Sequence, residues 1–414
     1  LAGRVAGGML AEGVRQVSRG KLPRATDLML TPANARRVAE KLSELRGAAM
    51  KVGQLLSMDN GEILPAELAS MLSVLRADAR PMPMSEVVTV MQESFGHGWE
   101  HRFKRFSFTP MAAASIGQVH AAITQGERQL ALKIQYPGIV ESIDSDVDNV
   151  ATLLNLSRLL PDGLDLQPLL QEAKRQLHEE ADYRLEARHL QHFELALEDR
   201  PEFLLPGVDE SLTRENILAM DLLEGEPIES LTTAPQETRD RVVGLLLELL
   251  FREMFEFGMI QTDPNLANFL YIPGTRQLGL LDFGATRRYP ARIIGAYRQL
   301  LESALREDHD AMSESARQIG YFKSGIHPQQ RAAVMELFVL ATEPARTRGR
   351  YNFGTSDLAV RIRDAGMALS FSQGYWHTPP ADAVFLHRKL GGLYLLAARL
   401  RARVEVHAIL DRYL

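Results

Sequence analysis

The nine residues LLDFGATRR (280–288) decide how the fold of this chain is interpreted, because they place Asp-Phe-Gly directly after a short apolar run. Asp-Phe-Gly is a tripeptide whose aspartate holds magnesium in phosphoryl-transfer enzymes. In a chain of 414 residues the tripeptide alone carries little weight. The interpretation therefore depends on whether the other parts of a phosphoryl-transfer site precede Asp282 at suitable spacing.

The segment IQTDPNLANFL (260–270) supplies the first of these parts. Asp263 and Asn268 are five residues apart, which is the D-x-x-x-x-N spacing of a phosphoryl-transfer catalytic loop. Asp263 would orient or deprotonate an acceptor, and Asn268 would ligate a second magnesium. Asp282 follows fourteen residues after Asn268, which leaves room for a strand pair. Asp-Pro before Asn is also ordinary turn chemistry, so the order of the three residues carries the prediction.

A strand with a lysine lies further upstream. In LALKIQYP the alternation of side chains puts Ala131 and Lys133 on the same face of a predicted strand. Lys133 there would clamp the phosphates of a nucleotide. The ordinary alternative is an exposed lysine at the edge of a sheet.

A lysine in a cleft needs a carboxylate to fix it, and the helical pattern LLQEAKRQLHEEADYRLEARHLQHF offers several. Glu179, Asp182 and Glu186 share one face of an ideal helix. Glu180 points roughly to the opposite side. A solvated acidic face is the ordinary alternative for this segment.

The loop that would cover the phosphates lacks the usual glycines. Such loops read G-x-G-x-x-G, because glycine lets backbone N–H groups approach the phosphate oxygens. Here the segment reads MAAASIGQVH (111–120), with three alanines and a serine in those places. Their Cβ atoms would stiffen the loop and change how it meets the phosphates. A plain strand turn is the alternative.

The remaining chain supplies the organisation around these motifs. Helical periodicity predicts helices at 31–60, 65–79 and 83–95 and a long helical region at 139–199. Strand patterns predict five strands, in HRFKRFSFTP, IGQVHAAIT, QLALKIQYP, EFLLPGVDE and NILAMDLLEG. From residue 235 the pattern is mostly helical, interrupted by a strand pair in NFLYIP and QLGLLDF.

This layout is that of an α+β fold, a bilobal protein-kinase-like fold with a five-stranded N-lobe, a helical C-lobe and an N-terminal helical extension. The expected units are an extension over 1–100, an N-lobe with a helical insertion over 101–224 and a C-lobe over 225–414.

Composition bounds the other functions. The chain has no cysteine, which excludes disulfides, thiolate metal sites and cysteine nucleophiles.

The net charge of the chain is −6, yet residues 1–51 carry ten Lys/Arg against four Asp/Glu. This basic segment predicts either docking on an anionic membrane surface or a solvated helix face, and it is not a nucleic-acid footprint. No run of 18 apolar residues predicts a membrane span. The first residue is Leu, which leaves open a preceding targeting or anchoring segment.

The motifs together resemble the UbiB/ADCK (AarF-type) atypical kinase-like family of ubiquinone (coenzyme Q) biosynthesis. The matching segments are MKVGQLLSM for the KxGQ signature, AAASIGQVH for an alanine-rich loop, ALKIQYPGI, EEADYRLEA for the ExD signature, QTDPNLANF, LLDFGA and LHRKLGGLYLL (386–396). They run through almost the whole chain. Gln261 before TDPN is similar to the mitochondrial and bacterial coenzyme Q members.

The resemblance implies ATP and Mg²⁺ as ligands, and a KxGQ helix that crosses the active site. The residues it marks as regulatory are Lys51, Gln54, Glu180 and Asp182. The residues it marks as catalytic or metal-binding are Asp263, Lys133 with its partner Glu186, Asn268 and Asp282. The residues it marks as nucleotide-binding are Ala112, Ala113, Ala114, Ser115, Gly117, Gln118, Lys133, Met220 as gatekeeper, Asp221 and Leu223. Because Glu180 lies off the face of Asp182, either the helix is distorted there or the carboxylates serve different partners.

The expected function is an atypical kinase-like ATPase that supports ubiquinone biosynthesis. Its partners would be biosynthetic enzymes or lipophilic quinone precursors, with peripheral membrane attachment on the cytoplasmic or mitochondrial matrix side. The KxGQ helix and the alanine-rich loop would suppress protein-kinase activity. Two alternatives remain open, a small-molecule or lipid kinase with the same site residues, and a nucleotide-gated, non-catalytic scaffold. The sequence does not set the oligomeric state.

Overall fold

The structure is a computed structural model, and the residues that it describes are 48, 51–52, 81–157, 167–322, 325–369 and 380–414. The helices predicted at 31–60 and 65–79 lie outside this part of the chain, except for Ala48, Lys51 and Val52, which are helical. Gln54 also lies outside it.

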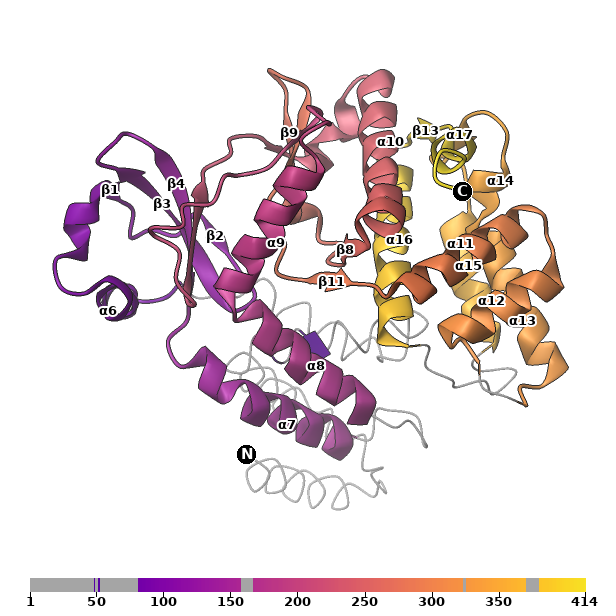
Figure 1. Cartoon of the computed structure of the whole chain (residues 1–414), viewed down its shortest axis with the longest axis horizontal. Helices are drawn as coiled ribbons and strands as arrows, with labels where there is room; N and C mark the ends of the chain where they lie inside the picture. The colour runs from indigo at the N-terminus through magenta and orange to yellow at the C-terminus, as the bar shows by residue number, and fades with distance from the viewer. Residues whose placement is uncertain (1–47, 49–50, 53–80, 158–166, 323–324, 370–379) are drawn as a thin grey trace, which may run out of the picture.

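One antiparallel sheet of five strands forms the N-lobe, at the left of Figure 1. Its strands are β1 (Phe103–Phe106), β2 (Ala112–Ala113), β3 (Gly117–Thr124), β4 (Gln129–Gln135) and β6 (Ile217–Asp221). Four of them follow the order β1-β3-β4-β6, and β2 pairs with β3. The predicted five-stranded lobe is therefore confirmed, but one of its strands differs from the prediction, because β2 belongs to the sheet and the strand predicted in EFLLPGVDE does not. The strand predicted in EFLLPGVDE is β5 (Phe203–Leu204), and it pairs with β10 (Gln277–Leu280) of another sheet.

Alternation along β4 sends its side chains to two different faces of the sheet. Leu130, Leu132 and Ile134 are buried in one apolar cluster with Trp99 and residues of α6 (Met84–Phe95). The other face carries Ala131 and Lys133, as predicted, and β6 adds Leu218 and Met220 to it. Helix α6 was predicted within the extension, and it packs on the N-lobe sheet. One face of the sheet is thus a core, and the other is available for a site.

The helical region predicted at 139–199 consists of three described helices. They are α7 (Ile139–Ser157), α8 (Gln167–Glu180) and α9 (Tyr183–Ala196). Asp182 separates the last two, because its side chain accepts a hydrogen bond from the Leu185 N–H at 3.0 Å and caps α9. The backbone therefore changes direction between Glu180 and Glu186, and α9 packs against β6 of the sheet (Figure 1).

The C-lobe is mainly helical. Its described helices are α10 (Gln236–Arg252), α11 (Ala291–Leu305), α12 (His309–Ile319), α13 (Pro328–Ala341), α14 (Glu343–Arg346), α15 (Leu358–Met367), α16 (Ala381–Arg399) and α17 (Val406–Leu410). Three short helical turns are η2 (Ile228–Thr233), the π-helical η3 (Glu253–Phe257) and η4 (Leu266–Asn268). The apolar run 242–251 lies in the buried part of α10. No helix in the described ranges is long and apolar enough to cross a membrane.

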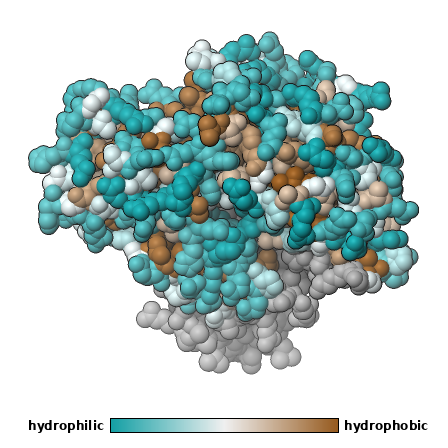
Figure 2. All heavy atoms as spheres, viewed as in Figure 1, coloured by the Kyte–Doolittle hydropathy of each residue, from teal (hydrophilic) through white to brown (hydrophobic). Residues whose placement is uncertain are grey.

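Short strands complete the C-lobe. The predicted strand pair is confirmed as β9 (Phe269–Ile272) and β10, which pair antiparallel. β5 and β7 (Glu226–Pro227) extend this sheet on either side. A second pair, β8 (Met259–Gln261) with β11 (Thr286–Arg288), brackets the catalytic and Asp-Phe-Gly segments. A third pair is β12 (Tyr351–Asn352) with β13 (Arg403–Val404). The face in Figure 2 is mostly hydrophilic, with its apolar side chains in small separate groups.

Gly117 tests the packing of the sheet beside the alanine-rich loop. A Cβ atom on Gly117 would lie 2.2 Å from the Ile134 carbonyl oxygen, so Gly117→Ala should lower the free energy of unfolding by about 1–3 kcal/mol. At the exposed Gly126 the nearest atom would be the Thr124 Oγ1 at 3.8 Å, and Gly126→Ala should change that free energy by about 0.5 kcal/mol or less. Urea unfolding followed by circular dichroism measures both. Equal losses in the two variants would contradict this packing.

Candidate active site

A buried ammonium group joins the two lobes. The Lys133 Nζ on β4 lies 2.9 Å and 2.8 Å from the two carboxylate oxygens of Glu186 on α9. It also lies 3.3 Å from the Asp282 Oδ2 in the Asp-Phe-Gly loop. The Tyr183 ring adds a cation–π contact with its centroid at 5.0 Å. The structure therefore brings together the predicted lysine, its predicted glutamate and the predicted metal aspartate.

Burial and charge set the protonation of this cluster. Burial acts to lower the pKa of Lys133, but the Asp282 and Glu186 carboxylates outweigh it and hold the pKa well above its ordinary value. Burial likewise acts to raise the pKa of Asp282, and the Lys133 ammonium and the Gly284 N–H bring it below its ordinary value. Lys133 is therefore a fixed cation and Asp282 a fixed anion near neutral pH.

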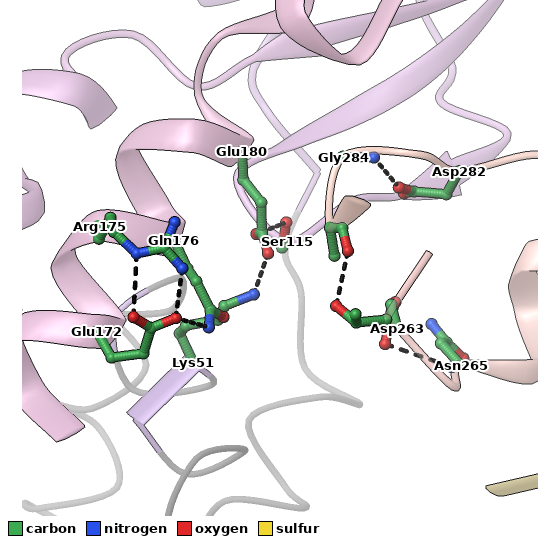
Figure 3. Close-up of polar contacts among 12 residues, drawn as sticks. Lys51, Ser115, Glu172, Arg175, Gln176, Glu180, Asp263, Asn265, Asp282 and Gly284 are labelled. Atoms are coloured by element: carbon green, nitrogen blue, oxygen red, sulfur yellow. Dashed lines mark hydrogen bonds and ion pairs between the residues drawn. The ribbon is translucent and has the colours of Figure 1, made fainter. Parts of the chain in front are cut away.

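The Asp-Phe-Gly loop is held in place by α9. The Asp282 Oδ1 accepts a hydrogen bond from the Gly284 N–H at 2.9 Å (Figure 3). The Phe283 ring packs on Phe193 with 4.7 Å between centroids, and its carbonyl lies 3.2 Å from the His189 Nδ1. His189 therefore helps to hold the loop that carries Asp282.

The catalytic-loop segment adopts a compact turn around Asp263. Its Oδ2 accepts a hydrogen bond from the Asn268 Nδ2 at 2.9 Å, and its Oδ1 accepts one from the Asn265 N–H at 3.3 Å. The Thr262 N–H and hydroxyl both donate to the Ala285 carbonyl, at 3.0 Å and 2.7 Å. These last two bonds tie the segment to the Asp-Phe-Gly loop. Asp263 and Asp282 consequently line the same pocket.

Asn268 and Asp282 offer oxygen ligands, which are the donors that Mg²⁺ prefers. The Leu281 N–H donates to the Asn268 carbonyl at 3.0 Å, so the two residues lie on neighbouring chain segments. Because the Asn268 Nδ2 is used by Asp263, its side-chain oxygen is the atom left for a metal. The residues present therefore fit a magnesium ion, whose charge would neutralise the phosphates of a bound nucleotide.

Lys51 and Glu180 form a second ion pair at the pocket. The Lys51 Nζ contacts the Glu180 Oε1, and the Ser115 hydroxyl donates to the Glu180 Oε2 at 3.2 Å (Figure 3). Glu180 therefore has different partners from Glu186, and the Asp182 cap distorts the helix between them, so both alternatives left open by the sequence hold. Asp182 itself caps α9 and lies outside the residues that line the pocket.

The alanine-rich loop leaves β2 and returns as β3. The Ala114 N–H donates to the Gly117 carbonyl at 2.9 Å and closes the turn, which presents Ser115 to the pocket. Ala112 and Ala113 are exposed strand residues. The loop thus borders the pocket beside the Lys51–Glu180 pair.

Gln118 is placed differently from its predicted neighbours. Its Oε1 accepts a hydrogen bond from the Met82 N–H at 2.9 Å, and its Nε2 lies 2.9 Å from the His120 Nε2. The side chain is buried on the α6 face of the sheet, away from Lys133. A side-chain contact between Gln118 and a nucleotide is therefore not supported, because alternation along β3 directs it to the core.

The predicted nucleotide-binding residues Met220 and Asp221 lie at the end of β6, and Leu223 follows this strand. Met220 is paired with Ala131 in the sheet register, on the Lys133 face. The Asp221 carboxylate lies 2.6 Å from the Arg128 Nε, and the Asp221 N–H donates to the Gly207 carbonyl at 2.9 Å. The N–H and the carboxylate of Asp221 are therefore engaged within the protein, and nucleotide binding by Asp221 and Leu223 stays a prediction.

Helix α16 contributes pocket residues that the sequence did not indicate. Phe385 and Arg388 line the pocket, and the Arg388 Nη2 lies 3.5 Å from the Asp263 Oδ1. Arg287, just after Asp-Phe-Gly, stacks over the Phe385 ring at 4.6 Å and bonds Asp382 at 2.7 Å. Such contacts depend on the tertiary approach of segments far apart in sequence. The paired glycines of LHRKLGGLYLL were the available signal, since glycine within a helix often marks close packing.

The bilobal fold, with a lysine–glutamate pair facing an Asp-Phe-Gly loop, defines the chain as a protein-kinase-like protein. The family described as the ABC1 atypical kinase-like domain matches residues 74–316. The chain belongs to this family of ATP-dependent phosphoryl-transfer enzymes. The resemblance to the UbiB/ADCK proteins is confirmed, and with it an atypical kinase-like role in ubiquinone biosynthesis.

Individual relatives match along most of their length. The chain is 39% identical to the mitochondrial atypical kinase COQ8 of Saccharomyces cerevisiae over 405 residues, which are 98% of this chain and 81% of that protein. It is 35% identical to the mitochondrial atypical kinase COQ8B of Rattus norvegicus, over 97% of this chain and 77% of that protein. The solved complex of Rv3197 with erythromycin from Mycobacterium tuberculosis superposes with a TM-score of 0.62 at 28% identity, over 92% of this chain and 95% of that one.

The contact between Arg388 and Asp263 gives a pH prediction. Burial raises the pKa of Asp263 and the Arg388 guanidinium opposes this, so Arg388→Met should raise that pKa further. A base acts only when deprotonated, so the acid limb of the pH profile of Mg-ATP turnover should move to higher pH. Arg292→Met, at an exposed position on α11, should leave the profile in place. An unmoved acid limb in Arg388→Met would contradict the role of this contact.

Proposed function

We propose that this chain binds Mg-ATP between its lobes and hydrolyses it in support of ubiquinone biosynthesis, with transfer to protein substrates suppressed. The observation that carries the proposal is the meeting of Lys133, Glu186 and Asp282 within hydrogen-bond distance beside Asp263. This set contains a phosphate cation, the carboxylate that fixes it, a metal ligand and a base, which are the parts that phosphoryl transfer needs.

Each residue has a defined part in this proposal. Lys133, held by Glu186, binds the phosphate oxygens, while Asn268 and Asp282 hold the magnesium ion that neutralises them. Asp263 orients the attacking water or acceptor and accepts its proton. Arg388 and the Asn268 amide keep the Asp263 carboxylate in one orientation. The alanine-rich loop with Ser115 covers the phosphates.

Lys51 supports the proposed suppression of protein-kinase activity. Its side chain is buried, lines the pocket, and acts electrostatically on both Asp263 and Asp282. A protein acceptor would have to approach these carboxylates through the space that Lys51 occupies. Lipophilic quinone precursors or their enzymes, met at a membrane surface through the basic residues 1–51, are the partners that we propose, on the mitochondrial matrix or cytoplasmic side.

Substitution of the metal aspartate tests this function. Wild-type protein should release phosphate from Mg-ATP. Asp282→Asn should lower the rate on the order of 100-fold, because the magnesium ion that stabilises the transition state loses a charged ligand. Asp310→Asn, at an exposed position on α12, is the matched control and should retain the wild-type rate. An unchanged rate in Asp282→Asn would reject the site.

Two other outcomes identify the alternative functions. Label from radioactive ATP that appears on a metabolite or lipid of a cell extract would identify a small-molecule or lipid kinase. Thermal stabilisation by Mg-ATP without hydrolysis, with and without anionic vesicles, would identify a nucleotide-gated scaffold.

A further inference from the structure

Another buried ion pair lies behind the catalytic segment, in the C-lobe core. The Lys389 ammonium on α16 contacts the Glu253 Oε2, and Glu253 is the first residue of the π-helical turn η3. Glu253 is only 1% exposed and Lys389 only 3%. Neither side chain lines the pocket, so neither is used by the proposed chemistry.

Glu253 also holds the backbone of the catalytic segment directly. Its carboxylate faces the Gln261 N–H, two residues before Asp263, and this N–H acts to lower the pKa of Glu253. The Gln261 side chain then donates from its Nε2 to the Asp263 carbonyl at 3.1 Å. A short chain of polar contacts therefore runs from the buried carboxylate to the residue that carries the proposed base.

Lys389 ties the same carboxylate to α16, which touches the other side of the catalytic segment. The neighbouring residue Arg388 lies 3.5 Å from the Asp263 Oδ1. One turn further along, Gly392 lies so close to Pro264 that a Cβ atom would be 2.7 Å from the Pro264 Cβ. At Gly391 nothing lies within 4 Å of such an atom.

Stability alone gives no reason for a charge pair in this place. Desolvation of two buried charges offsets their attraction, and well-packed apolar residues often replace such a pair without loss of stability. Burial raises the pKa of Glu253 to about 7, although Lys389 and the Gln261 N–H act to lower it. Its contacts lead to the catalytic segment, and π-helical turns are frequent at functional sites.

We propose that Glu253 and Lys389 are positioning residues for Asp263. The pair fixes the catalytic segment between η3 and α16, with Gln261 held from behind and Pro264 held by Gly392. The inference rests on the proposed function in taking Asp263 as the base. It assigns to α16 a role in catalysis that reaches beyond the pocket residues.

Two double variants test the pair, because a single substitution would leave an unpaired buried charge and could unfold the protein. Glu253→Gln with Lys389→Met removes both charges but keeps an oxygen that can accept from the Gln261 N–H. Glu253→Leu with Lys389→Met removes both charges and the acceptor. The two proteins differ at one side chain of similar size, which makes each the control for the other.

The account predicts different turnover in the two double variants. The Gln-containing variant should keep kcat for Mg-ATP hydrolysis within about 3-fold of wild type, since the Gln261 N–H keeps an acceptor. The Leu-containing variant should lose on the order of 100-fold in kcat with an unchanged KM for Mg-ATP, as expected when a catalytic group is misplaced by about 1 Å. Equal kcat in the two variants, whether retained or lost, would overturn the inference.

Amide hydrogen exchange supplies a readout that does not require turnover. Exchange at Gln261 should be faster in the Leu-containing variant than in the Gln-containing variant, measured where both are fully folded. Equal protection would overturn the inference. If wild-type protein does not hydrolyse Mg-ATP, the proposed function fails, and the exchange measurement still decides whether Glu253 holds the catalytic segment.

The two neighbouring glycines of α16 provide an independent test of its contact with the catalytic segment. Gly392→Ala should displace Pro264 and lower kcat at least about 10-fold, again with KM unchanged. Gly391→Ala adds the same methyl group to the same helix in open space and should leave kcat unchanged while raising the melting temperature. Retention of the wild-type kcat in Gly392→Ala would overturn the proposed contact between α16 and the catalytic segment.

Discussion

The buried Lys133 ammonium is the constraint on which the arrangement between the lobes depends. It is 7% exposed, and a charge in that position is tolerated only when carboxylates surround it. Removal of one partner from such a buried pair costs about 3–5 kcal/mol. Glu186 and Asp282 must therefore stay within reach of it, which fixes α9 and the Asp-Phe-Gly loop relative to the central strand β4.

A second consequence follows from the helix that supplies Glu186. Because Asp182 caps α9, the preceding helix α8 points Glu180 to a different part of the pocket, where Lys51 and Ser115 contact it. One acidic segment thus serves two cations. In the proposed function Lys133 binds the nucleotide phosphates, and Lys51 occupies the approach to Asp263. The proposed suppression of transfer to proteins rests on this division.

The sequence predicted what depends on local pattern and failed where long-range packing decides. Alternation around Lys133 predicted its face of the sheet, and the spacing of Asp263, Asn268 and Asp282 predicted a cluster that the structure assembles. The sequence wrongly placed β5 in the N-lobe sheet, because only two of its residues pair with β10 and so short a pairing leaves little sequence signal. Contacts of α16 with Asp263 were also missed, because this helix lies more than a hundred residues further along the chain.

The central claim is that Lys133, Asn268 and Asp282 form one nucleotide–metal site. A crystal structure with a non-hydrolysable ATP analogue and Mn²⁺ in place of Mg²⁺ tests it most directly, because the anomalous signal locates the metal. The account predicts a manganese peak coordinated by the Asn268 and Asp282 side-chain oxygens, with the analogue's phosphates on the Lys133 Nζ. A metal and nucleotide bound elsewhere in the pocket, without contact to these residues, would contradict it.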